Sequence, residues 1–239
     1  SGHRLFTLHP LIRAYAEREL SRRDQAAAHD LLRAAGAHLE KAGVHREAAS
    51  LYLRAGDVEK AVVPIRALVM GSLNAASPSS EAEWLELLPE DAVAHEPWLL
   101  MLRARLLQAR GRYDQACDLY RASVRLFHVQ ADPVGQLHGL LGQALCQYVL
   151  GRWEDSLGSL ARAERLAHTR EQRAEVLCNS ASVLLALCRW DEAVERLEMA
   201  LAQIGPESRP GLEARVDVYR ARLFFLRGLY VTGARWAQR

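Results

Sequence analysis

Apolar residues in this chain recur in helix-length segments separated by short polar turns. “PWLLMLRARLLQA” (97–109) is followed by an Arg-Gly pair and then by “RYDQACDLYRASVRLF” (112–127). Each segment is long enough for three or more helical turns. The chain must reverse between them, and Gly111 can supply the left-handed backbone that ends the first helix. The pattern therefore predicts a pair of antiparallel helices.

This turn is repeated along the chain. Aligned on Gly111, Gly151, Cys188 and Gly228, the copies lie 40, 37 and 40 residues apart, a spacing that suits stacked helix pairs. Small residues stand seven before the anchor and five and twelve after it, and an aromatic residue stands two after it: Ala104, Ala144, Ala181 and Ala221; Ala116, Ser156, Ala193 and Gly233; Ser123, Ala163 and Ala200; Tyr113, Trp153, Trp190 and Tyr230. We expect the small residues to let helices approach closely and the aromatic residue to fill the mouth of the hairpin. Because Cys188 replaces Gly, we expect its turn to be less tightly left-handed.

The front of the chain follows a shorter pattern. Gly43 and Gly56 are only 13 residues apart, which implies shorter helices. Ser80 and Glu83 form a capping-box pattern, and Pro64 should kink or split the helix that contains it.

Composition excludes several classes of function. The 31 basic and 29 acidic residues leave a net charge of +2, which is no electrostatic footprint for nucleic acid. No apolar run approaches the roughly 18 residues of a membrane span. The four cysteines form no CxxC pair, and Cys178 and Cys188 are too far apart to bridge on one helix, so we expect reduced, buried thiols in a cytoplasmic protein.

We find no sequence signature of an enzyme. The chain has no phosphate-binding loop, no GxGxxG or GxSxG motif and no HExxH motif, so we predict neither catalysis nor a metal site. Trp153 and Trp190 could be binding platforms, but their place in the turn favours a packing role.

The turn motif, with its Gly, aromatic and Ala positions in order, resembles the tetratricopeptide repeat. “LRARLLQARG” and “YRARLFFLRG” are similar to the longer variant in the MalT-like, LuxR-type large ATP-dependent regulators of the STAND class. The front half resembles the segment before the repeats in those regulators, and “FTLHPLIRAYAERELSRRD” resembles the end of their winged-helix domain. The resemblance implies that His9, in Leu8-His9-Pro10, faces a bound nucleotide in the parent protein, although Pro10 replaces the Asp of the family's Met-His-Asp triplet.

In tetratricopeptide arrays the first helix of each pair lines a concave groove. The register places seven residues toward it: Arg105, Gln108, His138, Tyr148, Ser182, Arg215 and Arg222. Arginines with hydroxyl and amide groups suit an anionic or polyhydroxylated ligand or an acidic peptide. The alternative is a solvated face on which the arginines pair with nearby Glu.

Together these observations predict an all-α fold, a right-handed superhelix of paired antiparallel helices. We expect a tag remnant and the end of a winged-helix domain at 1–23, a short-helix linker with front repeats at 24–93, and tetratricopeptide-like repeats at 94–239, the last one truncated. The resemblance implies the sensor and interaction segment of a STAND-type regulator. It would bind a protein partner or small inducer, carry no cofactor itself, and belong to a self-associating protein whose ATP or ADP site and DNA-binding domain lie elsewhere. A protein-binding scaffold without a regulatory role and a hydrolase with an unrecognised site remain the alternatives, and the identity of the inducer is open.

Overall fold

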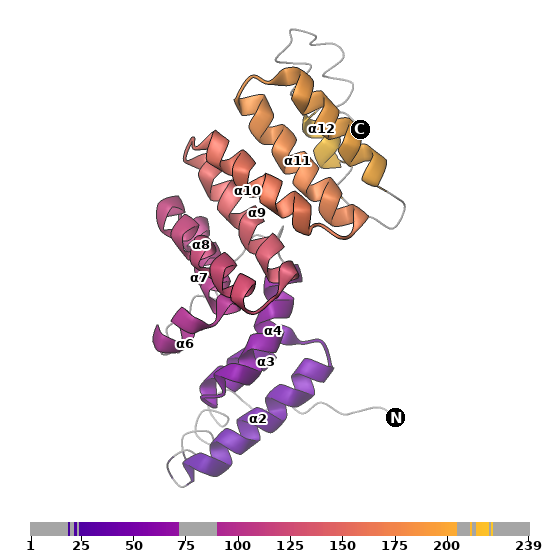
Figure 1. The fold of residues 1–239 in the computed structure, drawn as a ribbon. Coiled ribbons are helices and arrows are strands. Elements are labelled where there is room, and N and C mark those ends of the chain that lie inside the picture. The colour runs from indigo at the N-terminus through magenta and orange to yellow at the C-terminus, as the bar shows by residue number, and fades with distance from the viewer. Residues whose placement is uncertain are drawn as a thin grey trace, which may run out of the picture. The chain divides into compact units, whose positions relative to one another are not determined.

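A computed structural model describes residues 19, 22, 24–71, 90–204, 211, 214–219 and 221. The chain divides into two compact units, residues 1–94 and 95–239. In the first unit, helices α2 (Gln25–Lys41), α3 (His45–Arg54) and α4 (Val58–Gly71) pack in sequence, each against the next (Figure 1). Pro64 lies inside α4, so the expected split of this helix is wrong. The capping-box pattern at Ser80 lies outside the described residues.

The second unit is built from helix pairs. The short α6 (Glu90–His95) leads into α7 (Pro97–Ala109) and α8 (Tyr113–Val129), followed by α9 (Pro133–Val149) with α10 (Trp153–Leu166) and α11 (Arg170–Ala186) with α12 (Trp190–Gln203). Each helix from α7 to α12 packs against the next one, and residues 214–219 begin a further helix (Figure 1). The described residues contain no strand, which confirms the all-α prediction of paired helices.

The hairpin turns are left-handed at the predicted positions. Gly111 and Gly151 have φ of 75° and 74°. The amide of Gly111 donates to the carbonyl of Gln108, and that of Arg112 donates to the carbonyl of Leu107, which together close a Schellman motif. Cys188 has φ of 58° and its turn makes the equivalent two bonds, so the expectation of a less left-handed turn there is wrong. The two carbonyls at the end of α11 need these donors, and that requirement overrides the residue preference.

The small residues that flank each turn are buried, as predicted. All nine described positions of the three repeats are at most 3% exposed: Ala104, Ala116, Ser123, Ala144, Ser156, Ala163, Ala181, Ala193 and Ala200. Ser156 also donates a 2.8 Å hydrogen bond to the carbonyl of Ala144, which ties α10 to α9. These positions therefore form the close contacts between paired helices.

The contact from α8 to α9 depends on glycines that the turn-based alignment missed. Gly135, Gly139 and Gly142 line one face of α9, where an added Cβ would lie 2.3 to 2.7 Å from side chains of α8. The turn before α9 is also left-handed, at Ala131 with φ of 53°. Helices that belong to successive pairs are thus as closely packed as helices within a pair.

The front hairpin follows the same columns as the later repeats. Gly36, Ala48 and Ala55 stand seven before, five after and twelve after Gly43, and all three are buried. Gly43 has φ of 75°, and His45 takes the place of the aromatic residue. The α2–α3 hairpin is therefore built like a repeat, with a second helix shortened by the early turn at Gly56.

Candidate functional site

The first helices of the pairs, α7, α9, α11 and residues 214–219, position the residues of the candidate site. The residue after each buried Ala column position is Arg105, Leu145 or Ser182, and the residue one turn later is Ala109, Val149 or Ala186. These six residues are exposed or half-buried, and we call them the first-helix face. Arg105 and Ser182 were predicted to lie on it, and their equivalent Arg222 lies outside the described residues.

An aliphatic pair occupies the middle of this face. Leu145 and Val149 are 45% and 46% exposed and lie one turn apart on α9. Leu137, Leu140 and Leu141 of the same helix are at most 7% exposed. Sequence reasoning missed this pair because it searched the face for polar groups, although the register that selected Arg105 and Ser182 also selects Leu145.

Gln108 is engaged inside the protein. Its Oε1 accepts a 3.0 Å hydrogen bond from Oη of Tyr120 and lies 4.0 Å from Sγ of Cys146. Tyr120 is 3% exposed, and burial raises the pKa of its hydroxyl, as does the nearby Cys146, while the charge of Arg105 lowers it. The Gln108 amide oxygen therefore holds two helices together rather than facing a ligand.

The row that contains His138 is largely buried. Trp98, His138 and Glu175 occupy equivalent positions and are 4%, 8% and 7% exposed. Trp98 makes an edge-on ring contact with Phe127 at 4.9 Å between centroids. His138 thus belongs to the packing between helices. Tyr148, also predicted to face the groove, is half-buried and packs against the core formed by α8 to α11.

Arg215 is held by α11. Its Nη2 donates a 2.6 Å hydrogen bond to Oδ1 of Asn179, and its Nη1 lies 3.7 Å from Oε1 of the buried Glu175. This is the alternative in which an arginine pairs with a nearby Glu. Asn179 and Glu175 were missed, although both follow from the same register on α11. The structure brings Arg215 and α11 together but does not bring Gln108 or His138 to the surface.

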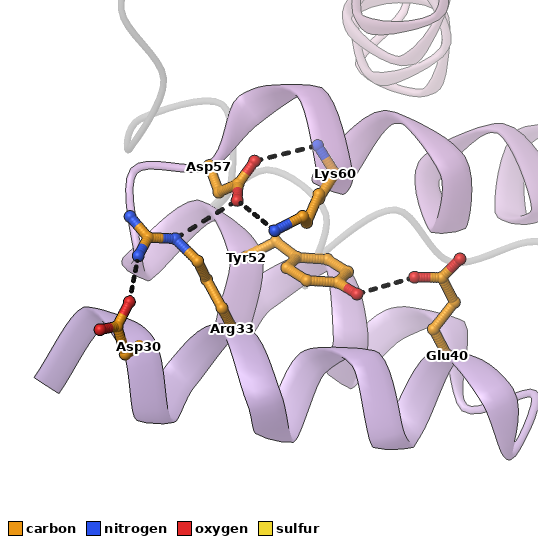
Figure 2. A network of polar contacts seen from close by, with 6 residues as sticks. All are labelled: Asp30, Arg33, Glu40, Tyr52, Asp57 and Lys60. Atoms are coloured by element: carbon orange, nitrogen blue, oxygen red, sulfur yellow. Dashed lines mark hydrogen bonds and ion pairs between the residues drawn. The ribbon is translucent and has the colours of Figure 1, made fainter. Parts of the chain in front are cut away.

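The front hairpin carries a separate polar network, which Figure 2 shows. Oδ2 of Asp57 lies 3.3 Å from Nε of Arg33 and 3.2 Å from Nζ of Lys60. Burial raises the pKa of Asp57, but hydrogen bonds and charge from Lys60, together with Arg33, outweigh it, so this pKa lies below its usual value. Oη of Tyr52 donates a 2.8 Å hydrogen bond to Glu40. The network ties the start of α4 and the middle of α3 to α2.

The described residues hold no cluster of three His, Cys, Asp or Glu side chains of the kind that binds a metal ion. None of the described helices is both long and apolar enough to cross a membrane. His9, which the resemblance places toward a nucleotide, lies outside the described residues. The arrangement that remains is a surface of aliphatic, hydroxyl, amide and guanidinium groups suited to non-covalent binding.

Comparison of the sequence with protein-family models and with curated proteins finds no match. The fold is similar to solved helical-repeat structures at low sequence identity. BtubC (BKLC) from P. vanneervenii aligns over 97% of this chain and 90% of its own, with 17% identity and a TM-score of 0.55. PilF of Pseudomonas aeruginosa aligns over 87% and 90%, with 17% identity and a TM-score of 0.51. A putative kinesin light chain of Podospora anserina with nearly identical TPR-like repeats aligns over 85% and 92%, with 18% identity and a TM-score of 0.50. The chain therefore has a TPR-like helical-repeat fold.

Proposed function

We propose that the repeats are a protein-binding scaffold that holds a segment of a partner on the first-helix face. The exposed pair Leu145 and Val149 carries this proposal. Ala109 and Ala186, at the positions equivalent to Val149, extend the apolar surface over three successive repeats. A contiguous apolar surface with polar groups along one edge, here Arg105 and Ser182, is typical of a site that binds another chain. Solenoid repeats commonly use such surfaces for binding.

The test uses peptides selected from a displayed random library on the 239-residue chain. A variant carrying Leu145→Gln and Val149→Thr should bind the selected peptides about tenfold or more weakly, because apolar contact area is lost. Its melting temperature should stay close to that of the parent, since both side chains are nearly half exposed. Met199→Gln is the matched control, because Met199 is 42% exposed on the second helix α12. Unchanged affinity in the double variant would place binding elsewhere.

The proposal extends to the protein that carries these repeats. The resemblance of residues 5–23 and of the repeats to MalT-like regulators supports a sensor segment of a cytoplasmic STAND-type transcriptional regulator. In that protein an inducer or protein partner on the repeats would control ATP-dependent self-association, while a separate domain binds DNA. We propose no catalytic role for this chain.

The rival function is a scaffold that binds a partner and regulates nothing directly. The full-length protein distinguishes the two. Adding a selected peptide should change its ATP-dependent self-association, measured by size-exclusion chromatography with light scattering, if the repeats are a sensor. Binding of the peptide with no change in assembly, with or without ATP, would favour the scaffold.

A further inference from the structure

The hairpin ends, where each first helix turns into its second helix, all carry an arginine at the same position. Arg112, Arg152 and Arg189 are the N-cap residues of α8, α10 and α12, with φ of −88°, −88° and −87° and ψ of 64°, 62° and 70°. None of the three side chains caps its helix. A guanidinium at the positive end of a helix is unfavourable unless an acidic group compensates it.

Two of the three hairpin ends supply that acidic group three residues later. Nε of Arg152 lies 2.9 Å from Oδ2 of Asp155. Arg189 makes a two-point contact with Glu192, at 2.7 Å from Nε and 2.6 Å from Nη2. Arg189 also lies 4.0 Å from Glu154 of the preceding hairpin, so successive hairpin ends adjoin one another.

The first hairpin end lacks the acidic residue. Gln115 takes the position of Asp155 and Glu192. Arg112 and its neighbour Arg110 are both exposed, and neither makes an ion pair or side-chain hydrogen bond within the part of the chain that the structure describes. Residues 97–113 contain four arginines and no Asp or Glu. Positive charge is therefore uncompensated at this one end of the α7–α8 pair.

An exposed aromatic side chain lies at the adjoining hairpin end. Trp153, the first residue of α10, is 38% exposed, whereas its equivalent Trp190 packs against a core cluster of α11 and α12. The charge of the neighbouring Arg152 acts on Cys117 in α8, which places the start of α10 beside the start of α8. The packing role expected for both tryptophans thus holds for Trp190 and only partly for Trp153.

We propose that Arg110, Arg112 and Trp153 form a docking surface for an acidic segment of a partner protein. Two carboxylates of the segment pair with the two guanidiniums, and an apolar side chain between them covers Trp153. Charge complementarity selects this partner, because exposed guanidiniums without acidic mates favour carboxylates. A nucleic acid would need many more phosphate contacts than two arginines of a nearly neutral chain provide. The surface is separate from the first-helix face.

The test measures fluorescence anisotropy of a labelled peptide that contains Glu-Glu-Leu repeats, titrated with the 239-residue chain. Exchanging Arg110 and Arg112 together for Gln should weaken binding about tenfold or more, because two charge-assisted contacts are lost. Gln115→Glu installs the acidic residue of the later hairpins and should weaken binding about threefold without loss of stability. Arg162→Gln, at an exposed arginine of α10, should leave binding unchanged and is the control.

Three results would overturn the proposal. The first is equal binding of the matching Gln-Gln-Leu peptide, and the second is unchanged affinity in both the double arginine variant and Gln115→Glu. The third is tighter binding of single-stranded DNA of the same length than of the acidic peptide. The Leu145→Gln and Val149→Thr variant should bind this probe like the parent chain, which separates the result from the test of the first-helix face.

Discussion

Oη of Tyr120 on α8 donates a hydrogen bond of 3.0 Å to Oε1 of Gln108 on α7, and the front hairpin repeats this relationship with Tyr52 and Glu40 at 2.8 Å. In both hairpins the acceptor stands three residues before the turn glycine and the tyrosine nine residues after it. The acceptor is a neutral amide in one hairpin and a carboxylate in the other. A charged acceptor makes the stronger hydrogen bond, and it also opposes ionisation of the tyrosine.

Loss of the Tyr52 hydroxyl should destabilise the first unit. Tyr52→Phe is expected to lower the free energy of unfolding by about 1–2 kcal/mol, because the hydrogen bond to Glu40 is lost while the ring stays packed on Gly36. Glu40→Gln keeps an acceptor and should cost less. Urea unfolding followed by circular dichroism measures both. A larger loss for Glu40→Gln than for Tyr52→Phe would show that the carboxylate has another structural role.

The same hydrogen bond should depend on pH in the alkaline range. Burial, the hydrogen bond to Glu40 and the charges of Glu40 and Asp57 raise the pKa of Tyr52 to about 12, from 10.0. The folded state thus favours the protonated phenol. Its contribution is fully present below pH 10 and is lost as the pH rises from 10 to about 12. The difference in stability between the parent and Tyr52→Phe should shrink over this range, and a constant difference would contradict the assignment.

The glycines of α9 should not tolerate a methyl group. In Gly142→Ala the new Cβ would lie 2.4 Å from the ring of Tyr120, which is buried and hydrogen-bonded to Gln108 and so cannot move aside easily. We expect a loss of about 1–3 kcal/mol, as for overpacked cores. Gly158→Ala is the control, because a Cβ at this exposed position of α10 would have no neighbouring atom within 4 Å. That change should stabilise the chain by about 0.5–1 kcal/mol through helix propensity.

The four cysteines, all free thiols, should react with a thiol reagent at very different rates. Burial raises the pKa of Cys146 to about 12 and that of Cys178 to about 11, and burial also raises the pKa of Cys117. Cys188 is exposed, so the sequence-based expectation of four buried thiols is wrong for it. At pH 8 one thiol should react within minutes and the rest only on unfolding, because the thiolate is the reactive form. Cys188→Ser should remove the fast phase, and a second fast thiol would contradict the burial of the other three.

Positions set by local geometry could be predicted from the sequence, and positions set by contacts between repeats could not. The small residues beside each turn were found because a turn fixes which residues of two helices meet. Gly142 was missed because it contacts the preceding pair, at a distance from the turn that the alignment on Gly111 and Gly151 does not constrain. The partner of Arg215 was missed for a similar reason, since Glu175 lies 40 residues earlier and meets it only when α11 and the next helix pack together.

The engagement of Arg215 makes its removal a test of whether it is a binding or a structural residue. From the sequence alone, Arg215→Ala should cost no more than an ordinary surface substitution, within about 0.5 kcal/mol. The structure predicts a larger loss of about 1–2 kcal/mol, because the change removes a charged hydrogen bond to Asn179 and leaves the buried carboxylate of Glu175 without its guanidinium. A double-mutant cycle with Glu175→Gln isolates this coupling: Arg215→Ala should cost clearly less in the Glu175→Gln background. Thermal and urea unfolding provide the four stabilities. Equal costs in both backgrounds would mean that the two charges are not coupled, and would return Arg215 to the candidates for ligand binding.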